Sequence, residues 1–543
     1  MFKKIAAATL AISIMLSAGA GNAFAYSAQM NTYSDVKQDW ATNSIYKLSA
    51  LGVISGMGDG TFQGNSVLTR EAFVKMLMAS IPADSEASKP MNLQDMKDST
   101  RWSYPYVKRA YDQGLIQFMI TDNQFKPGSE ITREEVAVLT GSLLLQAKTD
   151  VDRKAWLDSG WKVEESNRKF VDANKMNPNY LAELYYSSSQ GIMIGDKTGE
   201  FRPKASLTRK EAAAIIERVI NERIKDQPLS GIGYYAIESF KQADQMSLLN
   251  DVKFGWSELS YTADGVASLD MKTGEYAVPS GWEAAIQIAD QNKVQKELNI
   301  FANNKDGQLS KFLTDLPAQT AFIQSVQTAM TNNPYGFTGV SIDFEGLKEQ
   351  AEQPAFVSFL QALKKNLNGF TLSVAVPPTN WYKGYDLKSI GSIADQVIVM
   401  AYDFTHMESK LPSAPLPLVN EAIQTALKDI PKEKLVLGIS KQANQWIKRP
   451  DGTIVSEQPA IKLVEERVQK PGSKVEFAVP YFLSKITFTD DRGSHEIWYE
   501  DAESIEHKIW LAKFYGLQGV SLWYMGNYTA NDYEVIKQNT NKR

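Results

Sequence analysis

Two carboxylates on one apolar stretch are the residues of this 543-residue chain most suited to chemistry. The stretch 336–348 reads GFTGVSIDFEGLK, and its alternate polar positions are Ser341, Asp343 and Glu345. Alternate side chains of a strand share one face, so both acids would lie on the same side of a sheet. Two buried acids this close raise each other's pKa, which keeps one protonated near neutral pH, as a general acid requires. The alternative is a structural pair neutralised by a lysine or arginine elsewhere in the fold.

The elements that would position these acids follow from the pattern after residue 230. Eight short apolar runs predict strands over 232–237, 252–257, 297–302, 338–345, 372–376, 396–403, 435–439 and 519–524. Amphipathic stretches between them, such as 354–367 and 419–430, predict helices. This alternation predicts an α/β fold with a (β/α)8 TIM barrel over residues 230–540. Residues 441–501 interrupt the alternation and contain a predicted hairpin, so we expect a small β-containing insertion before the last helix and strand.

The predicted barrel would gather further polar and aromatic side chains around Glu345. Val340, Ile342 and Phe344 would face the helices, which leaves Glu345 closest to the C-terminal mouth, where active sites of this fold lie. Other strand ends would bring Tyr234, Tyr402, Asp403 and Trp523 to the same region. Each aromatic side chain alone is explained as well by core packing. Together with the acids, they predict a carbohydrate site.

Three stretches together resemble family-18 glycoside hydrolases. They are TGVSIDFE at 338–345, MAYD at 400–403, and Trp523. The family signature is D-x-x-D-x-D-x-E, and here Thr338 and Ser341 replace its first two acids. Within the family, the similarity is greatest to bacterial spore and cell-wall hydrolases.

The resemblance implies retaining, substrate-assisted cleavage of a β-linked polysaccharide containing N-acetylglucosamine, either peptidoglycan or chitin-like, without a metal or cofactor. Glu345 would protonate the leaving oxygen and later activate water. Asp343 would orient the substrate's 2-acetamido group, and Tyr402 would hydrogen-bond its carbonyl oxygen. The remaining substrate-binding positions implied are Trp523, Tyr234, Met400, Asp403 and Ser341. Since Ser341 cannot hold a charge, we expect an altered pH dependence.

Two other functions remain open at this point. A barrel that has lost catalysis would give a lectin-like, carbohydrate-binding surface protein, and retention of Glu345 favours the enzyme over this alternative. A purely structural surface-layer component would give no reason for acids inside a barrel strand.

The N-terminal part contains three similar units, over residues 26–90, 91–150 and 151–226. Each has an aspartate near its start, an amphipathic helix, a phenylalanine before a polar loop, and a Leu/Ile-Thr-Arg step that opens a second helix. The units are too small to bury their own apolar faces, so we expect them to pack together. The threonines at the helix starts are predicted N-caps, completed as capping boxes by Glu135 and Glu211.

An arginine follows each capping threonine, at Arg70, Arg133 and Arg209. A cation in the first turn of a helix opposes the helix dipole. An anionic ligand held by the helix-start N–H groups and the guanidinium would explain all three. The alternative is a solvated or locally paired arginine.

The three units resemble S-layer homology repeats. The resemblance implies a pseudo-threefold, largely α-helical module that binds secondary cell-wall polymers, often pyruvylated, of Gram-positive-type bacteria. The contact residues implied are Arg70, Arg133, Arg209, Asp35, Trp40, Asp95, Trp102 and Asp172.

The composition and the first residues indicate where the protein is located. Residues 1–25 have a basic start, an apolar run and an A-x-A site, and predict a secretory signal peptide. No later run is long and apolar enough to span a bilayer. We therefore expect a secreted protein held non-covalently at the cell wall or S-layer. A net charge of −5 and the lack of basic runs argue against nucleic-acid binding, and the absence of cysteine excludes disulfides and thiolate metal sites.

Overall fold

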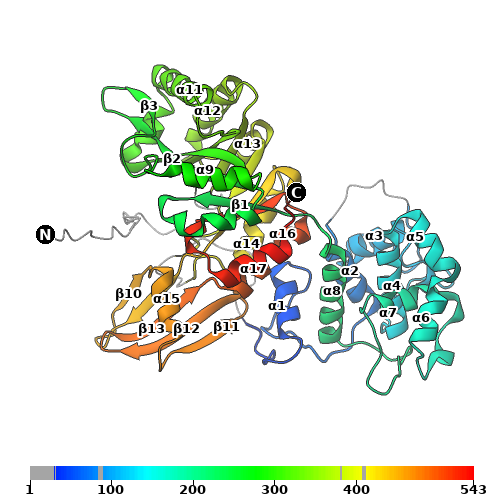
Figure 1. Ribbon diagram of the computed structural model, residues 1–543. Coiled ribbons are helices and arrows are strands. Elements are labelled where there is room, and N and C mark those ends of the chain that lie inside the picture. Colours follow the sequence, from blue (N-terminus) through cyan, green and yellow to red (C-terminus); the bar gives the residue numbers. More distant parts are fainter. Residues whose placement is uncertain (1–29, 31, 83–89, 379–381, 406–410, 543) are drawn as a thin grey trace.

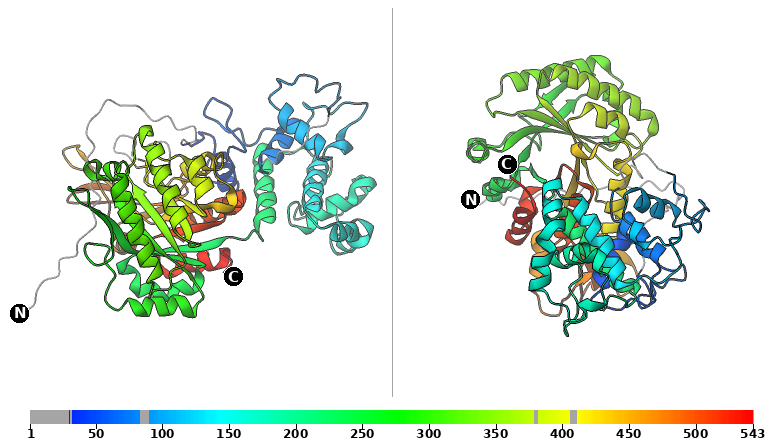
Figure 2. Two further views of the ribbon diagram at one scale, coloured as in Figure 1. Left: turned by 90° about the horizontal axis from the view of Figure 1, so that it is seen from above. Right: turned by 90° about the vertical axis from the view of Figure 1, so that its right-hand side faces the viewer.

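The structure is a computed structural model that describes residues 30, 32–82, 90–378, 382–405 and 411–542. The predicted signal peptide at 1–25 lies outside the described residues. The largest unit is a barrel of parallel strands with helices around it, next to a helical N-terminal module (Figures 1 and 2).

Eight parallel strands close the barrel in the order β1-β14-β8-β7-β6-β5-β4-β2, and β2 pairs with β1. Their bounds are β1 Ser230–Tyr235, β2 Asp251–Tyr261, β4 Gln295–Asn303, β5 Gly339–Glu345, β6 Thr371–Val376, β7 Gln396–Val399, β8 Leu435–Ser440 and β14 Gly519–Trp523. Each predicted strand corresponds to one of them, which confirms the (β/α)8 fold. The strand predicted over 396–403 is too long, since β7 ends at Val399. A further strand, β3 (Ala267–Asp270), pairs antiparallel with β2 and was not predicted.

The helices cover the outward face of the barrel strands. They are α9 Trp282–Gln291, α10 Gln308–Phe312, α11 Leu316–Thr331, α12 Gln353–Asn366, α13 Leu387–Ile393, α14 Leu416–Ala426, α16 Ala502–Tyr515 and α17 Ala530–Asn539. Phe344 of β5 packs among the rings of Phe312, Phe322 and Phe359, with centroids 5.4 to 6.5 Å away. The apolar register of β5 therefore faces the helices, as its alternation predicts.

One end of the barrel interior contains a buried charged network. Lys253 of β2 is fully buried and donates to Asp251 at 2.6 Å, Glu297 at 2.5 Å and Ser373 at 3.0 Å. A buried ammonium group is tolerated only when anions and acceptors surround it. Lys253 therefore provides the countercharge that both acids share in this layer.

The insertion between β8 and α16 is larger than the predicted hairpin. It forms a five-stranded antiparallel sheet in the order β10-β9-β13-β12-β11, beside the barrel (Figure 1). Its elements are β9 Asn444–Lys448, β10 Ile454–Glu457, α15 Ile461–Val468, β11 Lys474–Ala478, β12 Leu483–Asp490 and β13 Gly493–Tyr499. The predicted hairpin is β12–β13. Val464 of α15 packs on Ile486 and Ile497, which gives the insertion a small core of its own.

The N-terminal module consists of three helix–loop–helix repeats. Their helices are α1 Thr42–Ala50 with α2 Arg70–Ala79, α3 Tyr104–Asp112 with α4 Arg133–Gln146, and α7 Leu181–Ser189 with α8 Arg209–Ile224. Two short helices, α5 Asp150–Ala155 and α6 Trp161–Asn167, precede the third repeat. The segments before the second helices hydrogen-bond in a ring, from Leu68 to Leu207, Leu207 to Ile131, and Ile131 to Leu68. The repeats thus pack about a pseudo-threefold axis, and both predicted capping boxes are present.

The module contacts the barrel through α1 and α8, which lie against α14 and α16 (Figure 1). Asn420 of α14 donates to the carbonyl oxygen of Ala50 at 2.9 Å, and Trp510 of α16 donates to Asn221 at 2.7 Å. The ammonium group of Lys47 lies 4.9 Å from the Trp510 ring centroid. These contacts place the first and third repeats directly on the barrel. No helix in the described ranges is both long and apolar enough to cross a membrane.

Lys253→Met tests whether the buried network holds the barrel together. The variant would leave Asp251 and Glu297 as unpaired buried charges, so we expect a loss of about 3–5 kcal/mol in the free energy of unfolding at neutral pH. Burial already raises the pKa of Asp251 to about 6. The loss should therefore be smaller below about pH 6, where Asp251 can take up a proton. Urea unfolding at two pH values measures it, with exposed Lys311→Met as the control, and equal stability of both variants would contradict the assignment.

Candidate active site

Strand β5 directs Ser341, Asp343 and Glu345 into the barrel interior. Ser341 and Asp343 are almost completely buried, whereas Glu345 is half-buried at the C-terminal end. The neighbouring strand β4 places Asn299 opposite Ser341 and Phe301 opposite Asp343. The two acids are thus on one inward face, with Glu345 closest to the mouth.

The surroundings of the two acids raise both pKa values, but unequally. Burial raises the pKa of Asp343 to about 6, and the side-chain amide of Asn299 limits the rise. Burial raises the pKa of Glu345 to about 8, and the negative charges of Asp343 and Asp403 add to the effect. In the interval between these values the pair holds one proton on Glu345 while Asp343 is ionised. Such a pair can supply a general acid and an anion in one site.

A structural ion pair does not explain these acids. Within the described residues, neither Asp343 nor Glu345 forms a salt bridge with a lysine or arginine. Asp251 and Glu297, by contrast, share Lys253 inside the same barrel. The acids paired with a lysine in this barrel are therefore Asp251 and Glu297, and not Asp343 and Glu345.

Tyr402 lies beside the acids just after β7. Burial, together with the charges of Asp343 and Glu345, raises its pKa well above the usual value. Gly438 on β8 makes room for the ring, because a Cβ at this position would lie 3.3 Å from Tyr402 and 2.8 Å from the carbonyl oxygen of Val399. Met400 is half-buried, and Asp403 is exposed at the rim, where its amide donates to Ser413 at 3.1 Å.

Tyr234 and Trp523 add an aromatic pair to the site. Their rings meet edge-to-face with centroids 5.2 Å apart, at the ends of the adjacent strands β1 and β14. Burial and the charge of Asp343 raise the pKa of Tyr234. Trp523 is half-buried, so part of its indole remains available to a ligand. The structure thus brings the predicted aromatic residues and acids together.

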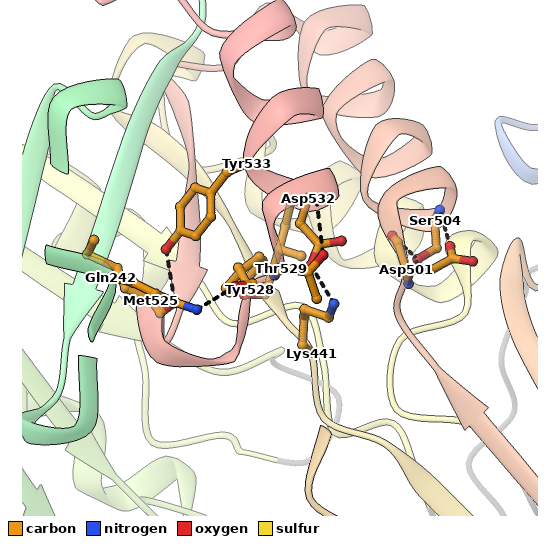
Figure 3. Close-up of polar contacts among 10 residues, drawn as sticks. Gln242, Lys441, Asp501, Ser504, Met525, Tyr528, Thr529, Asp532 and Tyr533 are labelled. Atoms are coloured by element: carbon orange, nitrogen blue, oxygen red, sulfur yellow. Dashed lines mark hydrogen bonds and ion pairs between the residues drawn. The ribbon is translucent and has the colours of Figure 1, made fainter. Parts of the chain in front are cut away.

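A group of hydrogen bonds fixes the chain that follows Trp523 (Figure 3). Tyr533 donates to the carbonyl oxygen of Met525 at 2.9 Å, and Gln242 donates to that of Tyr528 at 2.7 Å. Lys441, the first residue after β8, forms a buried ion pair with Asp532 of α17 at 2.5 Å. The start of the insertion and the segment beyond Trp523 are therefore tied to the same helix.

Three residues near the acids were missed by the sequence analysis. Asn299 shares the inward register of β4 with Glu297, and this polar alternation could have identified it. Tyr276 packs on Phe301 with ring centroids 5.0 Å apart, and Tyr382 has a pKa raised by burial and by the charges of Glu345 and Asp403. Both tyrosines come from loops, where no periodicity marks them.

In the N-terminal module, the predicted arginines join neighbouring repeats. Arg70 donates to the carbonyl oxygen of Phe125, Arg133 to that of Phe201, and Arg209 to that of Phe62. The N–H groups of the three arginines donate to carbonyl oxygens of the next repeat's loop as well. The prediction that these helix-start amides hold an anion is therefore wrong, because protein carbonyls already accept them. A contact between the guanidinium groups and a polymer stays a prediction.

The predicted aspartates hold the same loops from within each repeat. Asp35, Asp95 and Asp172 each accept two consecutive backbone N–H groups, at 2.6 to 3.0 Å. Trp40 and Trp102 are 61% and 56% exposed, which is unusual for tryptophan and leaves both rings available to a ligand. The aspartates thus stabilise the loops of the module, whereas the tryptophan side chains are exposed to solvent.

Comparison with known proteins identifies both parts. The profile described as glycosyl hydrolases family 18 matches residues 232–527. The chain belongs to this family. The S-layer homology domain profile matches 32–74, 94–137 and 169–213.

Two of the relatives are Bacillus proteins. A putative sporulation-specific glycosylase of Bacillus subtilis is 27% identical over 46% of this chain and 64% of its own length. A cortical fragment-lytic enzyme of Bacillus cereus is 26% identical over 49% of this chain and 65% of its own length. The chain thus spans just under two thirds of these relatives. The solved C-terminal domain of a putative chitinase from Desulfitobacterium hafniense is 20% identical, with a TM-score of 0.50, and covers 58% of this chain and 100% of that domain, which supports the fold.

The unequal pKa values predict a bell-shaped pH dependence of kcat/KM. Activity should fall below about pH 6, where Asp343 takes up a proton, and above about pH 8, where Glu345 loses one. Initial rates on a soluble chitin oligosaccharide measure the profile. If kcat/KM does not fall on the alkaline side up to about pH 9.5, the result would contradict the role of Glu345.

Asn299→Ala should move the acidic limb of that profile to higher pH. The amide of Asn299 lowers the pKa of Asp343, so its loss leaves burial unopposed and raises that pKa further. The alkaline limb should change less, and thermal unfolding should show that the barrel remains folded. Identical acidic limbs in variant and wild type would show that Asn299 does not influence Asp343.

Proposed function

We propose that the protein is a cell-wall-anchored glycoside hydrolase that cleaves a β-linked polysaccharide containing N-acetylglucosamine, with retention of configuration. The observation that carries this proposal is the unneutralised pair of Asp343 and Glu345 at the barrel mouth, with different pKa values and aromatic walls. Membership of family 18 supports a hydrolase, and the three surface-layer repeats support attachment to the wall.

The reaction begins with a proton transfer from Glu345 to the glycosidic oxygen. As the C1–oxygen bond breaks, the carbonyl oxygen of the substrate's 2-acetamido group attacks C1 and forms an oxazolinium ion. Ionised Asp343 accepts a hydrogen bond from the acetamido N–H and stabilises the positive charge. Tyr402 donates a hydrogen bond to the acetamido carbonyl oxygen and orients it.

Hydrolysis of the intermediate uses the same groups, and Glu345 now acts as a base instead of an acid. Glu345, now ionised, takes a proton from water as the water oxygen attacks C1. The oxazolinium ring opens, the acetamido group is restored, and two inversions at C1 give retention. Trp523 stacks on the apolar face of the sugar, and Tyr234 lies beside Asp343 to support it.

Peptidoglycan is the substrate that we favour over chitin-like chains. The curated relatives are described as a sporulation-specific glycosylase and a cortical fragment-lytic enzyme, and the repeats would hold the barrel at the wall itself. Secretion, with the protein held non-covalently at the wall, belongs to the same proposal. Product analysis after incubation with purified peptidoglycan and with chitin oligosaccharides distinguishes the substrates. Absence of cleavage in both would contradict the enzyme.

The alternative is a barrel that binds sugar without cleaving it. Thr338 and Ser341, which replace two acids of the family signature, are the feature that favours this reading. Glu345 at the mouth, with its raised pKa, favours the enzyme.

Glu345→Gln decides between these two functions. The substitution is nearly isosteric and removes the transferable proton, so hydrolysis should fall by about 10²–10⁴-fold while sugar binding remains. Since burial raises the folded-state pKa of Glu345 from its usual 4.5 to about 8, the wild-type protein loses stability as the pH rises from about 4.5 to about 8. The variant lacks this ionisation and should therefore unfold at a higher temperature than wild type at about pH 9, but not below about pH 4. Full hydrolysis by the folded variant would overturn the site.

A further inference from the structure

The buried apolar side chains of the N-terminal module and of the barrel form one continuous core. This core includes Leu48 of α1 in the module, and Val419 of α14 and Ile509 of α16 in the barrel. The antiparallel insertion, by contrast, contains two small clusters of its own. Separate domains usually have separate cores. The apolar packing therefore continues from the module into the barrel, although the two parts match different family profiles.

Asn420 of α14 is a polar contact at the centre of this junction. Its side-chain amide donates to the carbonyl oxygen of Ala50 at 2.9 Å, and its oxygen accepts from the Tyr515 hydroxyl at 2.7 Å. The side chain is 4% exposed, which is unusual for asparagine. Ala50 is the last residue of α1, where carbonyl oxygens have no partner within the helix. The barrel thus satisfies the end of a module helix.

Trp510 of α16 contacts both module helices. Its indole N–H donates to Asn221 of α8 at 2.7 Å, and the ammonium group of Lys47 from α1 lies 4.9 Å from its ring centroid. Lys47 is itself held by an ion pair with Glu217 of α8 at 2.6 Å. On the barrel side, the indole stacks on Phe514 with ring centroids 5.9 Å apart. A hydrogen bond and a cation–π contact therefore meet at one side chain.

The connection between the two parts is short and anchored. Helix α8 ends at Ile224 and β1 begins at Ser230, so only residues 225–229 connect them. Leu229 is buried, and its carbonyl oxygen accepts the amide of Asn541 at 2.8 Å. A segment of this length, fixed at its end, allows the module few positions other than the docked one.

The docked module has a defined place relative to the mouth of the barrel. The chain enters β1 at its N-terminal end, whereas Glu345 and the mouth lie at the C-terminal ends of the strands (Figure 1). Helix α16 also holds the insertion, because the His507 ring lies 4.7 Å from Phe482 and Lys508 pairs with Glu500 at 2.6 Å. One helix therefore contacts both the module and the insertion, which leaves the barrel at its mouth end.

We propose that the outward face of α14 and α16 is a docking surface for the N-terminal module, and that it holds the mouth of the barrel in a fixed orientation relative to the module. A docked barrel has little orientational freedom left to lose when it engages a glycan of the wall that the module binds. Hydrolysis of an insoluble wall therefore depends on the docking, whereas hydrolysis of a soluble oligosaccharide does not. This role in wall hydrolysis rests on the proposed function, and the docking itself does not.

A double variant of the full chain, Trp510→Ala with Asn420→Ala, tests the docking. We expect a larger radius of gyration in small-angle scattering, and cleavage by trypsin after the exposed Lys225 that is faster by about tenfold or more. Gln361→Ala, at an exposed glutamine of α12, is the control and should match wild type in both measurements. If the folded double variant scatters and is cleaved like wild type, the docking is overturned.

A milder pair of variants tests the same contact without emptying the interface. Trp510→Phe keeps a ring but removes the indole N–H, and Asn221→Ala removes its acceptor. Each should lower the midpoint of thermal unfolding, and the shift of the combined variant should fall short of the sum of the two. Shifts that simply add would show that these side chains do not meet in solution.

Initial rates on peptidoglycan sacculi and on a soluble chitin oligosaccharide test the role in wall hydrolysis. Per retained molecule, the docking variant should cleave sacculi several times more slowly, while its rate on the oligosaccharide stays that of wild type. An equal ratio of the two rates in variant and wild type would overturn the role in orientation and leave the docking intact. Absence of hydrolysis by wild type would overturn the proposed function and with it this role, while scattering and trypsin cleavage still decide the docking.

Discussion

The burial of two carboxylates without a countercharge is the constraint on which the barrel's chemistry depends. Removing an anion from water is costly, and proteins normally offset that cost with a cation or protonate the group. The barrel uses both solutions. Lys253 neutralises Asp251 and Glu297, while the pair at the mouth remains without a cation and is poised to share a proton. The same fold thus separates a structural layer from a reactive one.

The position of the reactive pair depends on contacts distant in sequence. Phe344 anchors β5 on the helices, so the opposite register must face inward. Gly438 on β8 leaves room for Tyr402, and the segment after Trp523 is held by Gln242 and the Lys441–Asp532 pair. Side chains from several strands therefore meet at one mouth of the barrel because contacts elsewhere in the fold hold those strands in place.

In the N-terminal module, the predicted arginines and aspartates form contacts within the module itself. Each arginine spans to the next repeat, and each aspartate holds a loop, so the three repeats form one closed ring. Because α1 and α8 also lie on α14 and α16, wall binding and hydrolysis would be carried out by parts in direct contact. The side chain of Trp40, by contrast, remains exposed at the surface of this ring.

The sequence by itself determined what depends on local periodicity. Alternating and helical patterns identified the eight barrel strands, the three repeats, both capping boxes and the inward direction of Asp343 and Glu345, because these follow from side-chain spacing along one element. Tertiary structure decided what depends on partners elsewhere. It showed that the arginines bind carbonyls of the next repeat, that Asn299 accompanies Asp343, that loop residue Tyr276 approaches the acids, and that the insertion is a complete sheet. No spacing along the chain contains this information, because burial and charge at a site are set by residues that meet only after folding.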